Sequence, residues 1–168
     1  MIIGRNPTEP EIDHGHFRET LGHFPSGVAV ITAITDDGPV GFSCQSFSSL
    51  SLDPPLILIA PAKTSTTWPR IHSVGSFCVN ILAAHQAVLA RRFAMSGADK
   101  FADVTWATGT SGVPRLDGVA AWIDADIAGV SDGGDHFIVQ GRVRALHGDP
   151  SVAPLVFHRG GFAELVQS

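Results

Sequence analysis

The amino-acid sequence predicts a mainly β protein, an antiparallel barrel with a few short helices. Apolar residues make up 44% of the 168 residues and charged residues only 16%, with 18 glycines and 11 prolines scattered among them. That composition is typical of a compact β-rich fold with many turns. About six or seven short apolar or alternating segments, bounded by turn residues, indicate strands joined by hairpins. The length predicts one domain, residues 13–168, after a flexible segment, residues 1–12.

Two or three short helices are predicted. Residues 13–24 carry apolar side chains at helical spacing behind Asp13, a potential N-cap. Pro69 is tolerated only in the first turn of a helix, so a helix begins there and the preceding hydroxyl-rich residues 63–67 cap it. Residues 85–95 are amphipathic, with their apolar side chains on one side.

The strands are predicted from β-branched or alternating runs. They cover residues 27–35, 40–44, 56–60, 77–82, 121–127, 136–146 and 155–157. Turns or loops are expected at residues 36–39, 99–117, 131–135 and 160–162. In one strand, Ile123, Ala125 and Ile127 alternate with Asp124 and Asp126. We expect the apolar side chains to face the core and both carboxylates to face water.

Several functional classes do not fit the chain. The formal net charge is −5 and the basic residues form no stripe, so no nucleic-acid surface is expected. The longest apolar stretches reach about half of the ~20 residues that a membrane span needs, and residues 1–10 lack an apolar signal core, so we expect a cytoplasmic protein. Cys44 and Cys78 have no metal or redox spacing, and His14 and His16 lack a third ligand, so no metal site is predicted. Dinucleotide, P-loop and serine-hydrolase motifs are absent from the sequence.

A polar segment, residues 41–55, precedes the apolar run 56–60. Its small hydroxyl, thiol and amide side chains let the main chain approach a flat ligand with many polar edge atoms; the alternative is a serine-rich turn. Residues 63–67 suit a phosphate, or ordinary helix capping. His136 follows a glycine-rich turn, residues 133–135, that can lift its imidazole to the barrel rim; the alternative is a solvated histidine at a strand end.

Four motifs in order carry a family resemblance. They are Phe17-Arg18 with Phe24-Pro25-Ser26-Gly27-Val28-Ala29-Val30-Ile31-Thr32, residues 41–55, Gly134-Asp135-His136, and residues 157–162. Over residues 13–165 the chain resembles the short-chain flavin reductase family, the reductase components of two-component flavin-dependent monooxygenases. The resemblance implies an FMN-binding split barrel that acts as a homodimer, reduces FAD or FMN with NADH or NADPH, and supplies reduced flavin to a partner monooxygenase.

The resemblance also implies the site residues. Those expected at the flavin ring and ribityl chain are Ser43, Cys44, Gln45, Ser46, Phe47, Ser49, Leu50 and Ser51. Those expected near the flavin phosphate are Ala62, Lys63, Thr64 and Ser65, with Phe93, Lys100 and Phe101 completing the flavin pocket. The C-terminal turn, Gly161, Phe162, Ala163 and Glu164, is expected near His136, the catalytic residue, which orients the nicotinamide. Cys44-Gln45 stand where family members often have Ala-Asn, and Phe162 stands where tyrosine is frequent.

Two other functions stay open from the sequence. The chain could keep its flavin tightly bound and reduce another acceptor, or it could be a non-catalytic flavin-binding barrel. Among the substrates we expect FAD over FMN, and we expect NADH over NADPH because no arginine cluster is present for a 2′-phosphate.

Overall fold

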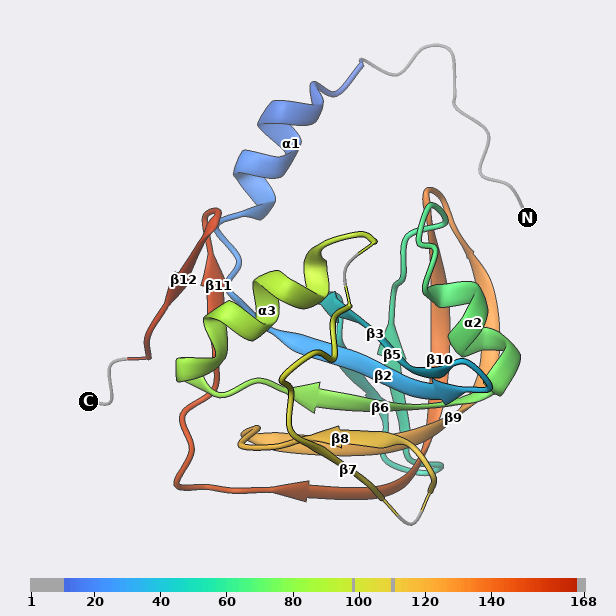
Figure 1. Ribbon diagram of the computed structural model, residues 1–168. Coiled ribbons are helices and arrows are strands. Elements are labelled where there is room, and N and C mark those ends of the chain that lie inside the picture. The colour runs from blue at the N-terminus through green and yellow to red at the C-terminus, as the bar shows by residue number, and fades with distance from the viewer. Residues whose placement is uncertain (1–10, 98, 110, 166–168) are drawn as a thin grey trace.

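A seven-stranded antiparallel sheet curls into a barrel (Figure 1). The computed structural model describes residues 11–97, 99–109 and 111–165, so residues 1–10 of the expected flexible segment lie outside the described residues. The strand order is β3-β2-β6-β9-β10-β5-β4. These strands are β2 (Ala29–Thr35), β3 (Gly38–Cys44), β4 (Ser48–Ser51), β5 (Leu56–Ile59), β6 (Ser76–Ile81), β9 (Ala121–Gly133) and β10 (His136–Gly148). The predicted fold class, mainly β and antiparallel, is confirmed.

The sheet has to curl because its two edge strands follow each other in the chain. β3 ends at Cys44 and β4 begins at Ser48, and so short a connection spans at most about 14 Å. Within it, Ser46 Oγ donates a hydrogen bond to Ala60 O (3.0 Å) and accepts one from Ala60 N (3.1 Å), just beyond the end of β5. The barrel is therefore open beside β3, and residues 45–47 bridge the opening.

Smaller elements flank the barrel. β1 (Ser26–Gly27), β11 (Val156–His158) and β12 (Gly161–Ala163) form a three-stranded sheet in the order β1-β11-β12, and β7 (Trp106–Thr108) pairs with β8 (Pro114–Leu116). The helices are α1 (His14–Leu21), α2 (Trp68–Val74) and α3 (Ala87–Ala94), with a 3-10 turn, η1 (Ala84–Gln86). The predicted helices are confirmed. The expected loop 99–117 instead contains the β7–β8 hairpin, and the serine-rich residues 48–51 form β4.

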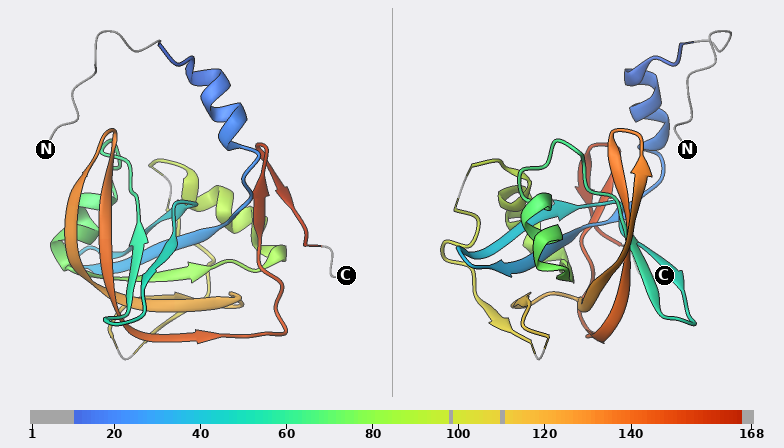
Figure 2. Two further views of the ribbon diagram at one scale, coloured as in Figure 1. Left: turned by 180° about the vertical axis from the view of Figure 1, so that it is seen from behind. Right: turned by 90° about the vertical axis from the view of Figure 1, so that its right-hand side faces the viewer.

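Helix α1 stands away from the barrel (Figures 1 and 2). Asp13 accepts a hydrogen bond from His16 N (2.8 Å), as predicted for an N-cap, but no residue of the helix is buried. The base of the helix is attached where Gly22 O accepts from Arg159 N (3.0 Å), in the turn between β11 and β12.

Both faces of β2 are buried. Ile31 belongs to one core cluster with Trp68 and Ile71 of α2, and Val30 belongs to a second cluster with Phe93 of α3. The two helices thus cover opposite faces of the same strand. This explains why the apolar residues of β2 follow one another instead of alternating with solvated side chains.

The buried polar residues of the described chain lie along one strip of the sheet, on β2, β6 and β9, facing the β7–β8 hairpin. Each is bonded to one residue of β8: Thr32 Oγ1 donates to Pro114 O (2.5 Å), Asn80 Oδ1 accepts from Leu116 N (2.8 Å), and Asp124 Oδ2 accepts from Arg115 Nη2 (2.5 Å). The hairpin therefore covers this face by polar contacts.

The expectation that Asp124 faces water is wrong. Its side chain is fully buried, whereas Asp126 is half-buried and pairs with Arg144 at the surface (2.5 Å). The prediction assumed that one face of the strand is solvated, as in many antiparallel sheets. Here the β7–β8 hairpin, which the sequence pattern did not predict, takes the place of water.

Candidate functional site

The end of β3 and the connection across the barrel opening hold the first group of predicted flavin residues, 43–47. Cys44 is buried, and its Sγ lies 3.3 Å from Ser46 Oγ. Burial raises the pKa of the Cys44 thiol, so the thiol stays protonated and donates to Ser46. These two side chains hold the connection in place, and Ser43 and Gln45 are left to line a cavity.

This cavity, the β12 cavity, has a volume of about 220 Å³ and lies beside the end of β3. Its lining includes Ser43, Gln45, Ala90, Arg91, Gly161 and Phe162. Phe162 packs edge-on against Phe157, with ring centroids 5.7 Å apart, and the Arg91 guanidinium lies 5.1 Å from the centre of the Phe162 ring. The cavity therefore offers an aromatic wall together with hydroxyl and amide groups, which suits a flat polar ring system.

A second cavity, the α2 cavity, has a volume of about 300 Å³ and also borders β3. Its lining includes Gly41, Thr66, Thr67, Arg70, Ser96 and Lys100, together with one carboxylate, that of Asp99. Lys100 Nζ donates to Gly41 O and to Phe93 O, both at 3.1 Å. Among the described residues no carboxylate lies within ion-pair distance of this ammonium, and burial lowers the pKa of Lys100. An ammonium has three donors, so one N–H of Lys100 is left for an anion.

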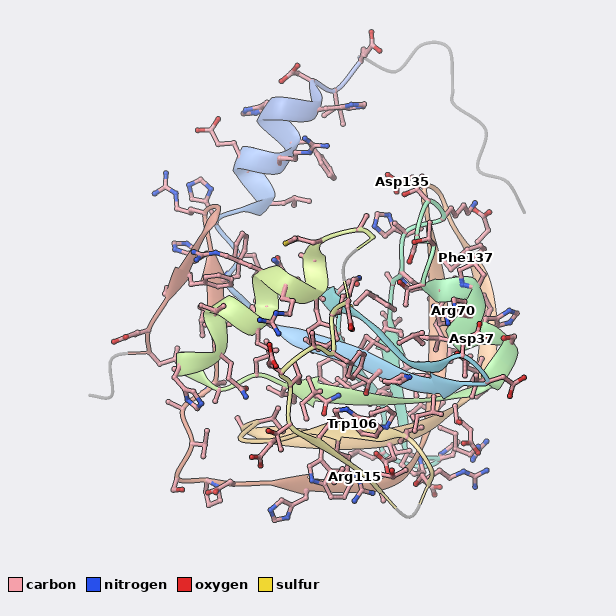
Figure 3. The ribbon with its side chains drawn as sticks, viewed as in Figure 1. Asp37, Arg70, Trp106, Arg115, Asp135 and Phe137 are labelled. Atoms are coloured by element: carbon pink, nitrogen blue, oxygen red, sulfur yellow. The ribbon has the colours of Figure 1, made fainter. Side chains whose placement is uncertain are left out.

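Arg70 adds a second cation to the α2 cavity (Figure 3). Its Nη2 donates to Thr35 Oγ1 (3.1 Å) and lies 3.5 Å from Asp37 Oδ2, whose side chain is largely exposed. An ion pair that is this long and this exposed is weak. Arg70 therefore keeps most of its capacity to bind an anion in the cavity.

Gly41 occupies a place where a side chain has no room. A Cβ at this position would lie 2.8 Å from Ile31 O and 2.9 Å from the Phe93 ring. Phe93 is fully buried and packs edge-on against Phe101, with ring centroids 5.1 Å apart. Of the three residues predicted to complete the flavin pocket, Lys100 and Phe101 line the α2 cavity, and Phe93 supports β3 from the core.

His136 begins β10 next to Asp135, at the tip of the β9–β10 hairpin (Figure 3). Its side chain is about half-exposed, and its Nδ1 lies 2.6 Å from Asp135 Oδ1. This hydrogen bond lowers the pKa of Asp135. Because a carboxylate only accepts, Nδ1 carries the proton, and in a neutral imidazole Nε2 is then a free acceptor. Ala62 forms a β-bridge with His136, and Lys63 N donates to Asp135 O (2.9 Å), so the main chain of both predicted residues lies against the segment that carries His136.

Other predicted residues take no part in either cavity. Ser49, Leu50 and Ser51 belong to β4, in a hairpin with β5 that flares away from the barrel (Figure 2). Thr64 is exposed, and Ser65 Oγ accepts from Trp68 N (3.1 Å), which is ordinary capping of α2. Ala163 and Glu164 line neither cavity.

The C-terminal turn and His136 do not meet within one chain. The turn between β11 and β12 and the tip of β9–β10 lie on opposite sides of the barrel opening (Figure 1). Gly161 and Phe162 instead face Ser43 and Gln45 across the β12 cavity. The expectation that this turn lies near His136 is therefore not met within the single chain.

The sequence reasoning missed several cavity residues. Arg91 on α3 and Ser96 just after it had no recognisable pattern, but Thr66 and Thr67 belong to the hydroxyl run already singled out, and Arg70 follows about one helical turn later. A search for cations one turn beyond that run finds Arg70.

Within the described residues, no group of three or more His, Cys, Asp or Glu side chains is arranged to hold a metal ion. In the same part of the chain, no helix is both long and apolar enough to cross a membrane.

Comparison with known proteins gives a consistent result. The family model for the flavin reductase like domain matches residues 21–166. The reductase subunit HsaB of a flavin-dependent monooxygenase from Mycobacterium tuberculosis is 47% identical over 154 residues, which cover 90% of this chain and 82% of HsaB.

Two solved structures are similar to the whole barrel. Nitrilotriacetate monooxygenase component B from Mycobacterium thermoresistibile superposes with a TM-score of 0.88 at 45% identity, over 90% of this chain and 86% of that one. The NADH:FAD oxidoreductase SgcE6 from Streptomyces globisporus, in complex with NAD and FAD fragments, superposes with a TM-score of 0.88 at 34% identity, over 92% and 93% of the two chains. Fold, motifs and sequence identity agree: the chain belongs to the flavin reductase-like domain family.

Proposed function

We propose that this chain is a flavin reductase that transfers a hydride from NADH to FAD and supplies the reduced flavin to a separate monooxygenase component. The observation that carries the proposal is that β3 borders two cavities of different chemistry. Gly41 lines the cationic α2 cavity, whereas Ser43 and Gln45 line the aromatic β12 cavity. A ligand that lies across the end of β3 therefore has a polar ring system at one end and an anionic group at the other, as a flavin nucleotide does. By their names, HsaB is the reductase subunit of a flavin-dependent monooxygenase, and SgcE6 is an NADH:FAD oxidoreductase.

The α2 cavity supports FAD as the preferred flavin. Lys100 has no carboxylate partner among the described residues, and Arg70 has only the weak pair with Asp37. Thr66 and Thr67 add hydroxyl donors to the same cavity. Two cations suit the two phosphates of FAD better than the single phosphate of FMN. The residues present thus fit the phosphate end of the flavin.

Lys100→Met is expected to raise the Kd for FAD at least about tenfold, because the variant keeps the length of the side chain but loses a charge-assisted hydrogen bond. Quenching of flavin fluorescence on binding measures this Kd. Arg144→Met, which removes an exposed cation of β10 from its pair with Asp126, is the matched control and keeps the wild-type Kd. An unchanged Kd in Lys100→Met removes the α2 cavity from the flavin site.

At the tip of the β9–β10 hairpin, His136 orients the nicotinamide. Its free Nε2 can accept a hydrogen bond from the carboxamide of NADH, while Asp135 fixes the ring through Nδ1. When bound, the flavin supplies the hydride acceptor. Hydride transfer would need the two rings to stack roughly 3–3.5 Å apart with water excluded, and it would need no acid–base catalysis.

The working form is proposed to be a cytoplasmic homodimer. Helix α1 and its flanks expose Ile12, Phe17, Leu21 and Phe24, and the β4–β5 hairpin exposes Leu50 and Leu52. Apolar surface of this extent suits a second copy of the chain. Light scattering is expected to give twice the mass of 17.7 kDa; the mass of a single chain contradicts the proposal.

Anaerobic steady-state assays with each pairing of FAD or FMN with NADH or NADPH test the proposed function. When all of the flavin is supplied free in solution, we expect its visible absorbance to be lost as it is reduced. We expect the highest kcat/KM for the pair of FAD and NADH. Flavin that stays with the protein through dialysis supports instead a flavoprotein that reduces another acceptor. No bleaching with any pair supports a non-catalytic flavin-binding barrel.

A further inference from the structure

The connection between β5 and α2 is fastened to the tip of the β9–β10 hairpin (Figures 1 and 2). Two main-chain hydrogen bonds flank His136: Lys63 N donates to Asp135 O, and Phe137 N donates to Pro61 O, both at 2.9 Å. The imidazole therefore stands on a segment whose main chain is held on both sides by residues 61–63.

The Lys63 side chain adds a second attachment to the same tip. Its Nζ lies 2.5 Å from Asp132 Oδ2 and 5.7 Å from the centre of the Phe137 ring. Asp132 also shapes the turn, because its Oδ1 accepts from Gly134 N (3.0 Å), where Gly134 has a φ of +85° that favours glycine. The ammonium thus contacts the strand before the turn and the strand after it.

These contacts leave Lys63 poorly placed to bind a flavin phosphate, the role that the family resemblance implies. Its charge is already paired with Asp132, and Lys63 does not line the α2 cavity. Lys100 and Arg70, which do line that cavity, have no strong carboxylate partner among the described residues. An anion in the α2 cavity is therefore expected to bind those two cations.

We propose that Lys63 is a positioning residue for His136: with Asp132 it clasps the β9–β10 tip, and it acts on nicotinamide binding and not on flavin binding. The contacts of Lys63 with Asp132 and Phe137 define the clasp, whereas its effect on the KM for NADH rests on the proposed function. In this proposal the clasp acts on NADH only through His136. Its removal is expected to loosen the segment that carries His136 while the barrel stays folded.

Kinetics of Lys63→Met and Asp132→Asn test the clasp. Both variants keep the length or shape of the side chain and remove one charge of the pair. Because the pair is partly exposed, each is expected to raise KM for NADH only about three- to fivefold, with the Kd for FAD unchanged within about twofold. The double variant is expected to be no worse than the single ones, since both lose the same contact. Lys63→Arg is expected to restore a KM close to that of wild type.

A phosphate role for Lys63 gives the opposite pattern. Lys63→Met then raises the Kd for FAD, and Asp132→Asn leaves it unchanged or lowers it, because a competing carboxylate charge is lost. That result, or an unchanged KM for NADH in either variant, overturns the proposal. Arg144→Met/Asp126→Asn, which removes another exposed pair between the same two strands, is the matched control and is expected to keep wild-type kinetics.

Amide hydrogen exchange gives a readout that does not depend on activity. In Lys63→Met, the amides of Gly134 and Phe137 are expected to exchange faster than in wild type, whereas β2 is unchanged. Unchanged exchange at the tip overturns the clasp whatever the kinetics show. If the wild-type protein does not oxidise NADH with any flavin, the proposed function fails, and the exchange experiment still decides whether the clasp exists.

Discussion

His136→Ala is expected to raise KM for NADH about tenfold and to leave the Kd for FAD within about twofold of wild type. His136 is half-exposed at the tip of β9–β10, where Asp135 fixes its Nδ1 and leaves Nε2 as an acceptor. The flavin is expected to bind against Ser43 and Gln45 and in the α2 cavity, and His136 lines neither of these places. Loss of the imidazole therefore removes a contact to the nicotinamide only. Anaerobic steady-state kinetics measure KM, and flavin fluorescence measures Kd.

His147→Ala is the matched control for this substitution. His147 lies on the same strand near its far end, where its ring packs at 6.0 Å from that of Trp122. The His147→Ala variant is expected to keep the wild-type KM for NADH and the wild-type Kd for FAD. Normal kinetics for NADH in His136→Ala contradict the role assigned to His136, and a weakened flavin affinity with a normal KM assigns it to the flavin instead.

Asp124→Asn is expected to lower the free energy of unfolding by about 3 kcal/mol. Asp124 is fully buried, and two of its oxygens accept from Arg115, at 2.5 Å and 3.3 Å. The Arg115 guanidinium is itself enclosed. On one side it lies 3.4 Å from the centre of the Trp122 ring, and on another it packs so close to Gly109 that a Cβ on this glycine would lie only 2.2 Å from the guanidinium carbon. Removal of the carboxylate charge leaves this guanidinium without a counter-ion in a partly buried place.

Urea unfolding measures the loss, with Asp126→Asn as the control. Asp126 lies two residues along the same strand and makes a surface pair with Arg144, so its substitution is expected to cost less than about 1 kcal/mol. The double variant Asp124→Leu/Arg115→Met is expected to recover much of the loss, since no charge is then left unpaired. Equal costs for Asp124→Asn and Asp126→Asn contradict the structural role given to the buried pair.

Strands with strong local patterns were predictable from the sequence. The β-branched run of β2 and the apolar run of β5 needed no information from distant residues. The β7–β8 hairpin was not predictable, because its short strands carry little periodicity and are held by Thr32, Asn80 and Asp124 from other strands. The burial of Asp124 could not be predicted for the same reason: its partner Arg115 comes from that hairpin.

The candidate site was predictable only in part. Residues 43–47 are local in sequence, and their small polar side chains indicate a ligand that approaches the main chain. The contact of Lys63 with Asp132 depends on how β5 and the β9–β10 tip meet in space, which no spacing in the sequence encodes. Arg70 was missed because α2 places it at the cavity by its rotation about the helix axis.

A crystal structure of the protein with FAD and NAD⁺ tests the central claim most directly. We expect the flavin ring against residues 43–47, its phosphates between Lys100 and Arg70, and the nicotinamide on the side of His136. A flavin ring bound elsewhere, for example in the large cavity between Trp106 and Trp122 at the far end of the barrel, contradicts this account.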